Sequence, residues 1–455
     1  MTLFPQNPCK NIDRSLPYTY VSISYQEKPP LISNPVSFQV YGAKNMIRII
    51  TRFLRSLPKW VFKDTGAGFK TMLSFSSIVF LLAGPDVRAQ TDECDYFVSW
   101  VEAAKETYQK THRIYPVPAR LKTQAIRYMP RLWVSPRSWR PIYFEDYLAK
   151  SILYRRSGGH VLTESPLADE LAAMTFEEQC RTYLDSEKVA SRSTAPIYVQ
   201  FYRDKKPGDP SEKWTYVKYN LVFDWSGLPE ELSRIGKAGV FLIRGDRMRW
   251  HRLDIHMAAI LAFDASNRLR MLTLAQHNHQ QTYLPGEDFS PDQRPRLVAA
   301  EGSNELYLDN GEEGAVSHRV VPFFDKVAYL IDPEQKPWLW AKDTTYGRNA
   351  GGIEIPLEPI FIKPKHPLAD FSGLLGPPRR FFGIYTGQDG PPGFNYYAPP
   401  SYISLANFAA MGFWKEGDHG LLDEIGPLID GPENTDWEGL VKVMERRLSE
   451  ALQRN

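Results

Sequence analysis

Short apolar runs separated by turn sequences dominate the middle of the chain. Runs such as APIYVQFYR (195–203) are rich in β-branched and aromatic residues, and several alternate polar and apolar positions as half-buried strands do. FDASNRLR (263–270) has the composition of a hairpin connection. Because no helical pattern intervenes, we expect an antiparallel β-sandwich rather than a doubly wound sheet. The predicted strands lie within 195–203, 213–225, 238–245, 251–264, 269–280 and 295–303.

Helical periodicity flanks this β-rich region on both sides. Apolar residues recur every three or four positions in 95–112 and again in 166–190. Between them, prolines and arginines alternate from Pro116 to Pro141, which indicates an extended, irregular connection. The segment 436–455 predicts an amphipathic helix that docks on the domain, with binding of a partner as the alternative. Its apolar stripe contains Leu440, Val443, Met444, Leu448 and Leu452.

An apolar run before the first of these helices has the features of a secretory signal peptide. MLSFSSIVFLLA (72–83) follows several lysines and precedes VRA (87–89), a small-residue cleavage sequence before Gln90. The run is too short for an ordinary membrane-spanning helix. We therefore expect a secreted or periplasmic protein, translated from Met72 or Met46, with no spanning segment in its mature chain. The alternative is a core strand or helix of an N-terminal domain.

These patterns divide the chain into five parts. They are an N-terminal extension, the signal peptide, a mostly helical and irregular region, the β-sandwich, and a loop-rich segment that ends in the C-terminal helix. In that order the parts span 1–71, 72–89, 90–194, 195–365 and 366–455.

Composition supports a globular, β-rich protein and excludes some partners. Hydrophobic residues make up 43% and charged residues 24% of the chain, which supplies a sizeable core. Aromatic residues reach 13%, and 36 prolines exceed 30 glycines, which favours short strands joined by rigid loops. The net charge of +2 is nearly balanced, so nothing indicates binding to nucleic acid.

Cysteine usage is sparse. With residues 1–89 removed, Cys94 and Cys180 are the remaining pair. In an oxidising compartment they are candidates for one disulfide that closes a long loop, and two buried free thiols are the alternative. Their spacing matches no zinc-finger or C-x-x-C pattern.

Histidines cluster in RWHRLDIHMAAILAFD (249–264) and just beyond it, although the chain has only nine. On a strand, Asp254 and His256 share a face, whereas His251 points away from both unless the strand bulges. His277 and His279 follow on the next strand of the predicted hairpin. Such a convergence suits a divalent cation, with Asp–His general base catalysis or a polar edge on an ordinary strand as alternatives.

Other candidate groups carry weaker signals. Glu301 and Glu305 flank GSN and either add a carboxylate to this site or are surface acids. His318 lies in a polar VSHR segment. GRNAGG (347–352) is not followed by a lysine and a helix, so a phosphate loop is not expected, and no G-x-S-x-G sequence occurs.

The histidine-rich stretch resembles two related families. HRLDIH (251–256) is similar to the histidine–arginine–histidine–aspartate–tryptophan–glutamate motif of necrosis- and ethylene-inducing-like proteins. It also resembles the histidine–acid–x–aspartate–tryptophan–glutamate motif of the vacuolar-protein-sorting-62-like family. LAQHNHQQTY (274–283) resembles the serine–x–histidine–glycine strand that follows in both. RPRLVAAEGSNELYL (294–308) resembles a later strand of the second family, and YNLVFDWSG (219–227) lies where an aromatic strand precedes the motif.

This resemblance covers about residues 195–310 and implies an antiparallel β-sandwich with a divalent cation near one end. By residue-to-residue matching, the ligands implied are His251, Asp254, His256 and His277. The chain departs from the motifs in three places: His256 replaces the final glutamate, Ile255 replaces tryptophan, and Asn304 replaces the histidine of the glycine–serine–histidine strand. Loss of a carboxylate leaves the identity of the ion open.

We therefore expect an exported β-sandwich protein that binds a divalent metal ion and recognises an extracellular ligand, such as a glycan or a lipid headgroup. Aromatic residues of the trailing loops are candidates for stacking on that ligand, and packing within the loops is the alternative. These residues are Trp338, Trp340, Tyr396 and Tyr397.

Two other functions fit the same residues. In a metal-dependent hydrolase the ion would activate water, and His279 or Glu301 would move protons. In a structural protein without metal, the histidines would only be hydrogen-bonded. One sandwich hosts unrelated functions, so the resemblance bears on fold more than on activity.

Overall fold

The computed structural model describes residues 112–232, 249–255, 257–276, 280–320, 341–381, 384–388, 404–414, 419–428 and 436–454. All of them belong to one of the two compact units of the chain, which contains Ala89–Asn455. The predicted signal peptide at 72–89, residues 95–111 of the predicted helix at 95–112, and the predicted strand at 238–245 lie outside the described residues.

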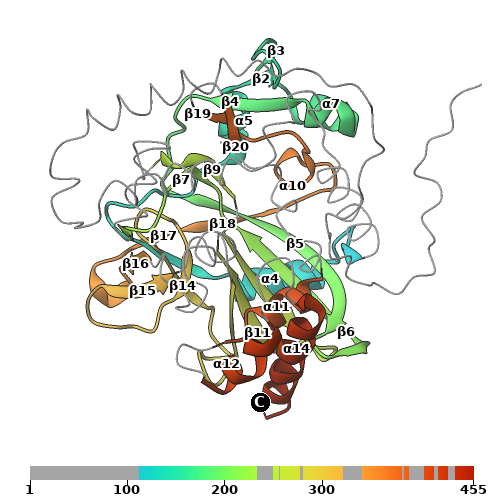
Figure 1. The fold of residues 1–455 in the computed structure, drawn as a ribbon, viewed down its shortest axis with the longest axis vertical. Helices are drawn as coiled ribbons and strands as arrows, with labels where there is room; N and C mark the ends of the chain where they lie inside the picture. The colour runs from blue at the N-terminus through green and yellow to red at the C-terminus, as the bar shows by residue number, and fades with distance from the viewer. Residues whose placement is uncertain are drawn as a thin grey trace, which may run out of the picture. The chain divides into compact units, whose positions relative to one another are not determined.

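A six-stranded sheet is the largest element of the fold (Figure 1). Its strand order is β12-β11-β10-β6-β5-β18, and every neighbouring pair is antiparallel except β18 with β5. The predicted hairpin at 263–270 joins β10 to β11. The strands are β5 (Ala195–Lys206), β6 (Asp209–Asn220), β10 (Ala258–Phe263), β11 (Leu269–Ala275), β12 (Gln280–Tyr283) and β18 (Leu357–Phe361).

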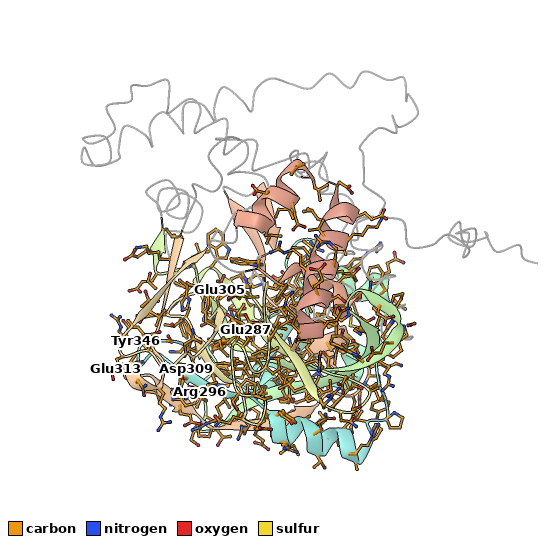
Figure 2. All side chains as sticks on the ribbon, turned by 90° about the horizontal axis from the view of Figure 1, so that it is seen from below. Glu287, Arg296, Glu305, Asp309, Glu313 and Tyr346 are labelled. Atoms are coloured by element: carbon orange, nitrogen blue, oxygen red, sulfur yellow. The ribbon has the colours of Figure 1, made fainter. Side chains whose placement is uncertain are left out.

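A second sheet has four strands in the order β14-β13-β1-β17. Strand β1 is parallel to β13 and antiparallel to β17. The sandwich therefore includes a strand from well before residue 195, within a region that we expected to be helical and irregular. Glu305 and Asp309 flank β14 at its two ends (Figure 2). The strands are β1 (Arg131–Val134), β13 (Arg296–Ala299), β14 (Leu306–Leu308) and β17 (Ile353–Ile355).

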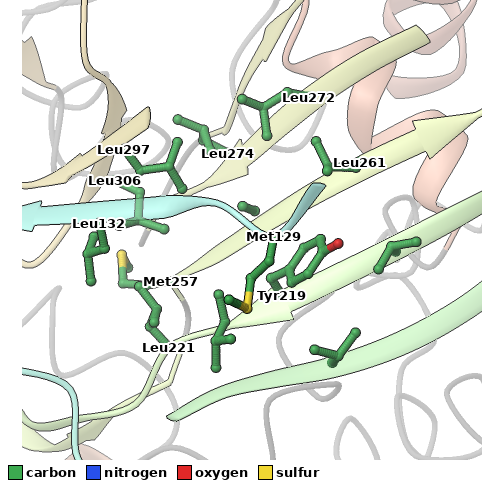
Figure 3. Close-up of a cluster of buried hydrophobic side chains, with 14 of the residues drawn as sticks. Met129, Leu132, Tyr219, Leu221, Met257, Leu261, Leu272, Leu274, Leu297 and Leu306 are labelled. Carbon is green, nitrogen blue, oxygen red and sulfur yellow. The ribbon is translucent and has the colours of Figure 1, made fainter. Parts of the chain in front are cut away.

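The two sheets pack face to face around one hydrophobic core (Figure 3). Alternate residues of each strand point inward, as the strand period of two requires. Helix α4 (Ala119–Tyr128) adds Leu121 and Ala125, and the buried Tyr219 hydroxyl donates to the Ala125 carbonyl at 2.8 Å. The fold is thus mainly β, with an antiparallel β-sandwich core, as predicted. Central members of the core are Leu132, Val217, Leu221, Met257, Leu261, Leu272, Leu274, Leu297 and Leu306.

Helices from the C-terminal part cover the other face of the six-stranded sheet (Figure 1). They are α11 (Leu405–Met411), α12 (His419–Ile425) and α14 (Trp437–Arg454). In α14, Met444, Leu448 and Leu452 pack on sheet residues such as Tyr216 and Met271. Because both faces are covered, every residue of β10 is buried, and the strand shows no alternation of buried and exposed positions.

Smaller elements surround the sandwich. Sheet β3-β2-β4 and sheet β15-β16-β8 have three strands each, and β7–β9 and β19–β20 are pairs. The strands are β2 (Ser151–Arg155), β3 (Val161–Glu164), β4 (Thr182–Ser186), β7 (Phe223–Ser226), β8 (Glu231–Leu232), β9 (His251–Asp254), β15 (Val316–Val320), β16 (Ala341–Thr345), β19 (Pro378–Phe381) and β20 (Ile384–Gln388). The helices are α5 (Phe144–Ala149), α6 (Ala168–Ala173), α7 (Phe176–Cys180), α10 (Pro367–Asp370) and the short 3-10 helices Arg348–Ala350 and Gly426–Leu428.

Two predicted elements are divided in the structure. The expected helix at 166–190 consists of α6, α7 and strand β4. Thr175 separates the two helices because it caps α7: its Oγ1 accepts from the Glu178 amide at 3.2 Å, and Glu178 accepts from the Thr175 amide at 2.7 Å. The expected strand at 251–264 is also divided, since β9 pairs with β7 and β10 belongs to the large sheet.

Among the described residues, no helix is long and apolar enough to cross a membrane.

The packing of α14 generates a stability prediction. Leu448 is completely buried against the large sheet, so Leu448→Ala should lower the free energy of unfolding by about 3 kcal/mol. Denaturant unfolding of the full chain measures this. Gln453→Ala, on the exposed side of the same helix, is the matched control and should change little. Equal effects of the two substitutions would contradict the docking of α14.

Candidate functional site

Strand β9 carries the histidine–aspartate stretch at one end of the sandwich and pairs with β7. Ser226 lies opposite His251, and Phe223 lies opposite Asp254. Leu253 has a φ of 41°, which breaks the extended conformation between the two candidate ligands. The simple alternation that would direct His251 and Asp254 to opposite faces therefore does not hold here.

Asp254 is completely buried and hydrogen-bonded to a residue fifty positions further along the chain. Its Oδ2 accepts from Nδ2 of Asn304 at 2.9 Å, and the same Nδ2 donates to the Trp225 carbonyl at 2.9 Å. Both partners are acceptors, so the orientation of the Asn304 amide is fixed. The structure thus brings together two of the stretches that carry the family resemblance. Asn304 acts by orienting the Asp254 carboxylate.

Asn304 also has a special backbone conformation. Its φ is 62°, in the left-handed region that asparagine tolerates better than most residues. It lies in the turn that follows β13, and its amide N–H bonds back to the Ala300 carbonyl at 3.3 Å. The turn thereby presents the Asn304 side chain toward β7 and β9.

His251 is half-buried at the start of β9. Its Nδ1 lies 2.9 Å from the Arg252 carbonyl, which can only accept, so Nδ1 carries the proton. In the neutral imidazole this places the lone pair on Nε2. A histidine fixed in this way by a carbonyl has the tautomer typical of metal ligands.

A buried ion pair joins β9 to β7 within the same strand pair. Arg252 and Asp224 are 3.0 Å apart and are exposed by only 3% and 2%. Burial raises the pKa of Asp224, and the charge of Arg252 opposes this rise. Arg252 also donates to the Glu187 carbonyl at 3.1 Å and stacks over the Trp225 ring at 4.6 Å. The sequence did not predict this pair. Its only indication in the sequence is a charged residue within each of two short strands, Asp224 in FDWS and Arg252 in HRLD.

Both carboxylate oxygens of Glu301 contact neighbouring side chains. Its Oε2 accepts from the Ser135 hydroxyl at 2.9 Å, and its Oε1 lies 3.0 Å from the Arg137 guanidinium. A second Arg137 nitrogen contacts Oε2 at 3.1 Å. Both oxygens therefore have donors, which suits a structural anchor between β1 and β13 better than a proton acceptor.

A second buried polar cluster lies beside the turn that carries Asn304. Asp343 on β16 accepts from Ser303 Oγ at 2.8 Å, and the Tyr307 hydroxyl lies close to both Asp343 and Glu305. The ring of His318 stacks on Tyr307 with centroids 3.8 Å apart. Sequence reasoning named Glu305 and His318 but not Asp343.

Several predicted site residues lie outside the described residues. Cys180 is buried and disulfide-bonded, whereas its predicted partner Cys94 is not described, so the pairing stays a prediction. Within the described part of the chain, no three histidine, cysteine, aspartate or glutamate side chains are grouped as a metal site. The residues outside are Cys94, His256, His277, His279, Trp338, Trp340, Tyr396 and Tyr397.

Comparison with known proteins finds only a weak similarity of fold. No protein-family model matches the chain, and no curated protein matches it. Solved structures of NLPPya, a necrosis- and ethylene-inducing-like protein, superpose on 55% of this chain and 76% of their own. They are a triple mutant (11% identity, TM-score 0.22), a complex with mannosamine (12%, 0.23) and a complex with glucosamine (12%, 0.21). Such TM-scores assign neither a family nor a ligand to this chain.

The Asp254–Asn304 contact generates a second prediction. Asn304→Asp keeps the shape and the left-handed backbone but replaces the donor by a carboxylate that repels Asp254. We expect the free energy of unfolding to fall by about 2 kcal/mol or more at neutral pH. Asn267→Asp is the matched control, because Asn267 has a φ of 60° in the exposed hairpin turn. Indistinguishable unfolding curves for the two variants would show that the contact does not contribute.

Proposed function

We propose that this chain is an exported β-sandwich protein that binds a divalent cation at one end of the sandwich and recognises an extracellular ligand there. The proposed ligands of the ion are His251, Asp254, His256 and His277. The proposed partner is a glycan or a lipid headgroup, contacted by the aromatic residues of the trailing loops.

The buried Asp254 carboxylate is the observation that carries this proposal. It is completely buried, and its orientation is set by Asn304 through a 2.9 Å hydrogen bond between distant parts of the chain. A ligating carboxylate that is itself held by a hydrogen bond is the usual arrangement around protein-bound metals.

The described candidate residues offer the kinds of ligand atom that divalent ions bind. Asp254 supplies a carboxylate oxygen, and His251 has the tautomer with its lone pair on Nε2. Ala258 and Ala275 form the last described pair of the β10–β11 ladder, and they lie two positions along the chain from His256 and His277 respectively. A bound cation would neutralise the carboxylate and offer coordination positions to hydroxyl or phosphate oxygens of a ligand.

The site favours binding over hydrolysis. A hydrolase needs a base with an available lone pair beside the ion. Glu301, one of the two residues considered for that role, already accepts from Ser135 and Arg137 through both oxygens. We therefore place recognition ahead of catalysis.

Metal analysis of the purified full chain tests the proposal. We expect a stoichiometric divalent ion in the wild type and its loss in Asp254→Asn. Titration calorimetry with Ca²⁺, Mg²⁺, Mn²⁺ and Zn²⁺ separately would identify the preferred ion. Asp264→Asn is the control, because Asp264 is also largely buried but pairs with Arg268 in the β10–β11 turn. Equally negligible metal in the wild type and Asp254→Asn would contradict the proposal.

Export is tested separately by the N-terminus of the mature protein. We expect mass spectrometry of the native protein to find an N-terminus near Gln90, produced by cleavage after VRA (87–89). A cytoplasmic product that retains residues 1–71 would contradict export while leaving the metal site to its own test.

A further inference from the structure

Tyr307, in β14, contacts two buried acidic residues where β14 meets the sheet β15-β16-β8. Its hydroxyl oxygen lies 2.9 Å from Asp343 Oδ2 and 3.0 Å from Glu305 Oε2. Asp343 and Glu305 are exposed by 0% and 4%. The Tyr307 hydroxyl oxygen thus lies within hydrogen-bonding distance of two buried carboxyl groups at once.

The protons available to this cluster can be counted. The Tyr307 hydroxyl has one hydrogen and can donate it fully to only one of the two carboxyl groups. The Ser303 hydroxyl hydrogen points to the other oxygen of Asp343, Oδ1, at 2.8 Å, while Ser303 Oγ accepts from the Glu305 amide at 3.2 Å. When the Tyr307 hydroxyl donates to one carboxyl group, its contact with the other is a hydrogen bond only if that carboxyl group is protonated and donates to the Tyr307 oxygen.

The described side chains around Tyr307 favour a neutral carboxyl. His318, which stacks on Tyr307, has its pKa lowered to about 4 by burial and is uncharged at neutral pH. Its Nε2 lies 2.9 Å from the Thr345 hydroxyl. The other side of Tyr307 packs on apolar residues of three strands: Trp133, Val298 and Leu232. Burial, reinforced by the charge of Glu305, raises the pKa of Asp343 well above its usual value.

We infer that Glu305 and Asp343 share one carboxyl proton at neutral pH, and that this proton holds the β15-β16-β8 sheet against the edge of the sandwich. Glu305 precedes β14 and Asp343 lies in β16, so the pair joins the two sheets. The Glu301 amide also donates to the Thr344 carbonyl at 2.9 Å beside it. Loss of the shared proton leaves two like charges in contact and loosens this junction.

The sign of the pH dependence follows from the direction of the shift. Because the folded state keeps the Asp343 proton after the unfolded chain has lost it, this contribution to the free energy of unfolding is largest below the usual aspartate pKa. It falls as the pH rises toward the folded value. His318 acts in the opposite direction, since its contribution is complete above 6.5 and is lost as the pH falls toward 4. A difference between wild type and an Asp343 variant cancels the His318 term.

Infrared difference spectroscopy of the full chain tests the inference. We expect the C=O stretch of a protonated carboxyl at neutral pH in the wild type. The band should be lost in Asp343→Asn or in Glu305→Gln, and it should persist in the exposed control Asp292→Asn. The melting temperature of the wild type should fall more steeply than that of Asp343→Asn as the pH rises from mildly acidic to alkaline values.

Two results would overturn the inference. One is a wild-type spectrum without a protonated-carboxyl band at neutral pH. The other is a band unchanged by both substitutions, together with parallel melting profiles of wild type and Asp343→Asn. If a variant does not fold, titration of the wild-type band still decides, since the shared proton requires a midpoint above that of ordinary carboxyl groups.

Discussion

Burial of the six-stranded sheet on both faces is the constraint on which the structure depends. One face packs on the four-stranded sheet and the other on α11, α12 and α14. Polar groups inside these layers must find partners within the protein. Asp204 does so by accepting from the Ser404 hydroxyl and the Ala406 amide, at 3.1 and 3.4 Å, which also fixes the start of α11. The candidate site residues therefore lie at an end of the sandwich, where β9 pairs with β7 outside the large sheet.

The end formed by β7 and β9 shows how such a site is built. β9 and β10 are separated by only three residues, yet they belong to different sheets. The Arg252–Asp224 pair holds β9 on β7, and Asn304 reaches from the second sheet to Asp254. Beside the same turn, Ser303 and Tyr307 contact Asp343, and the Tyr307 hydroxyl also contacts Glu305. Residues 301–307 thus link the sandwich, the candidate site and the outer sheet.

Much of the fold could be predicted from the sequence, and the exceptions have physical causes. Period-two patterns identified β5, β6, β10 and β11 of the large sheet and the hairpin between the last two, but not the edge strand β18. They did not identify β1, because four residues among prolines carry little periodic signal. The division of 251–264 was missed because an apolar run does not reveal that a strand changes sheets. The resemblance brought Asp254 and Asn304 into consideration, whereas Asp343 in AKDTT has no local signal, because its partners lie about forty residues away.

The central claim is that a divalent cation binds beside Asp254, and anomalous X-ray diffraction tests it most directly. Crystals of the full chain soaked in Mn²⁺ should show an anomalous peak within coordination distance of an Asp254 carboxylate oxygen. The same map should show which of His251, His256 and His277 share the ion. An absent peak at Asp254 in a well-ordered crystal, or a peak bound only elsewhere, would contradict the account.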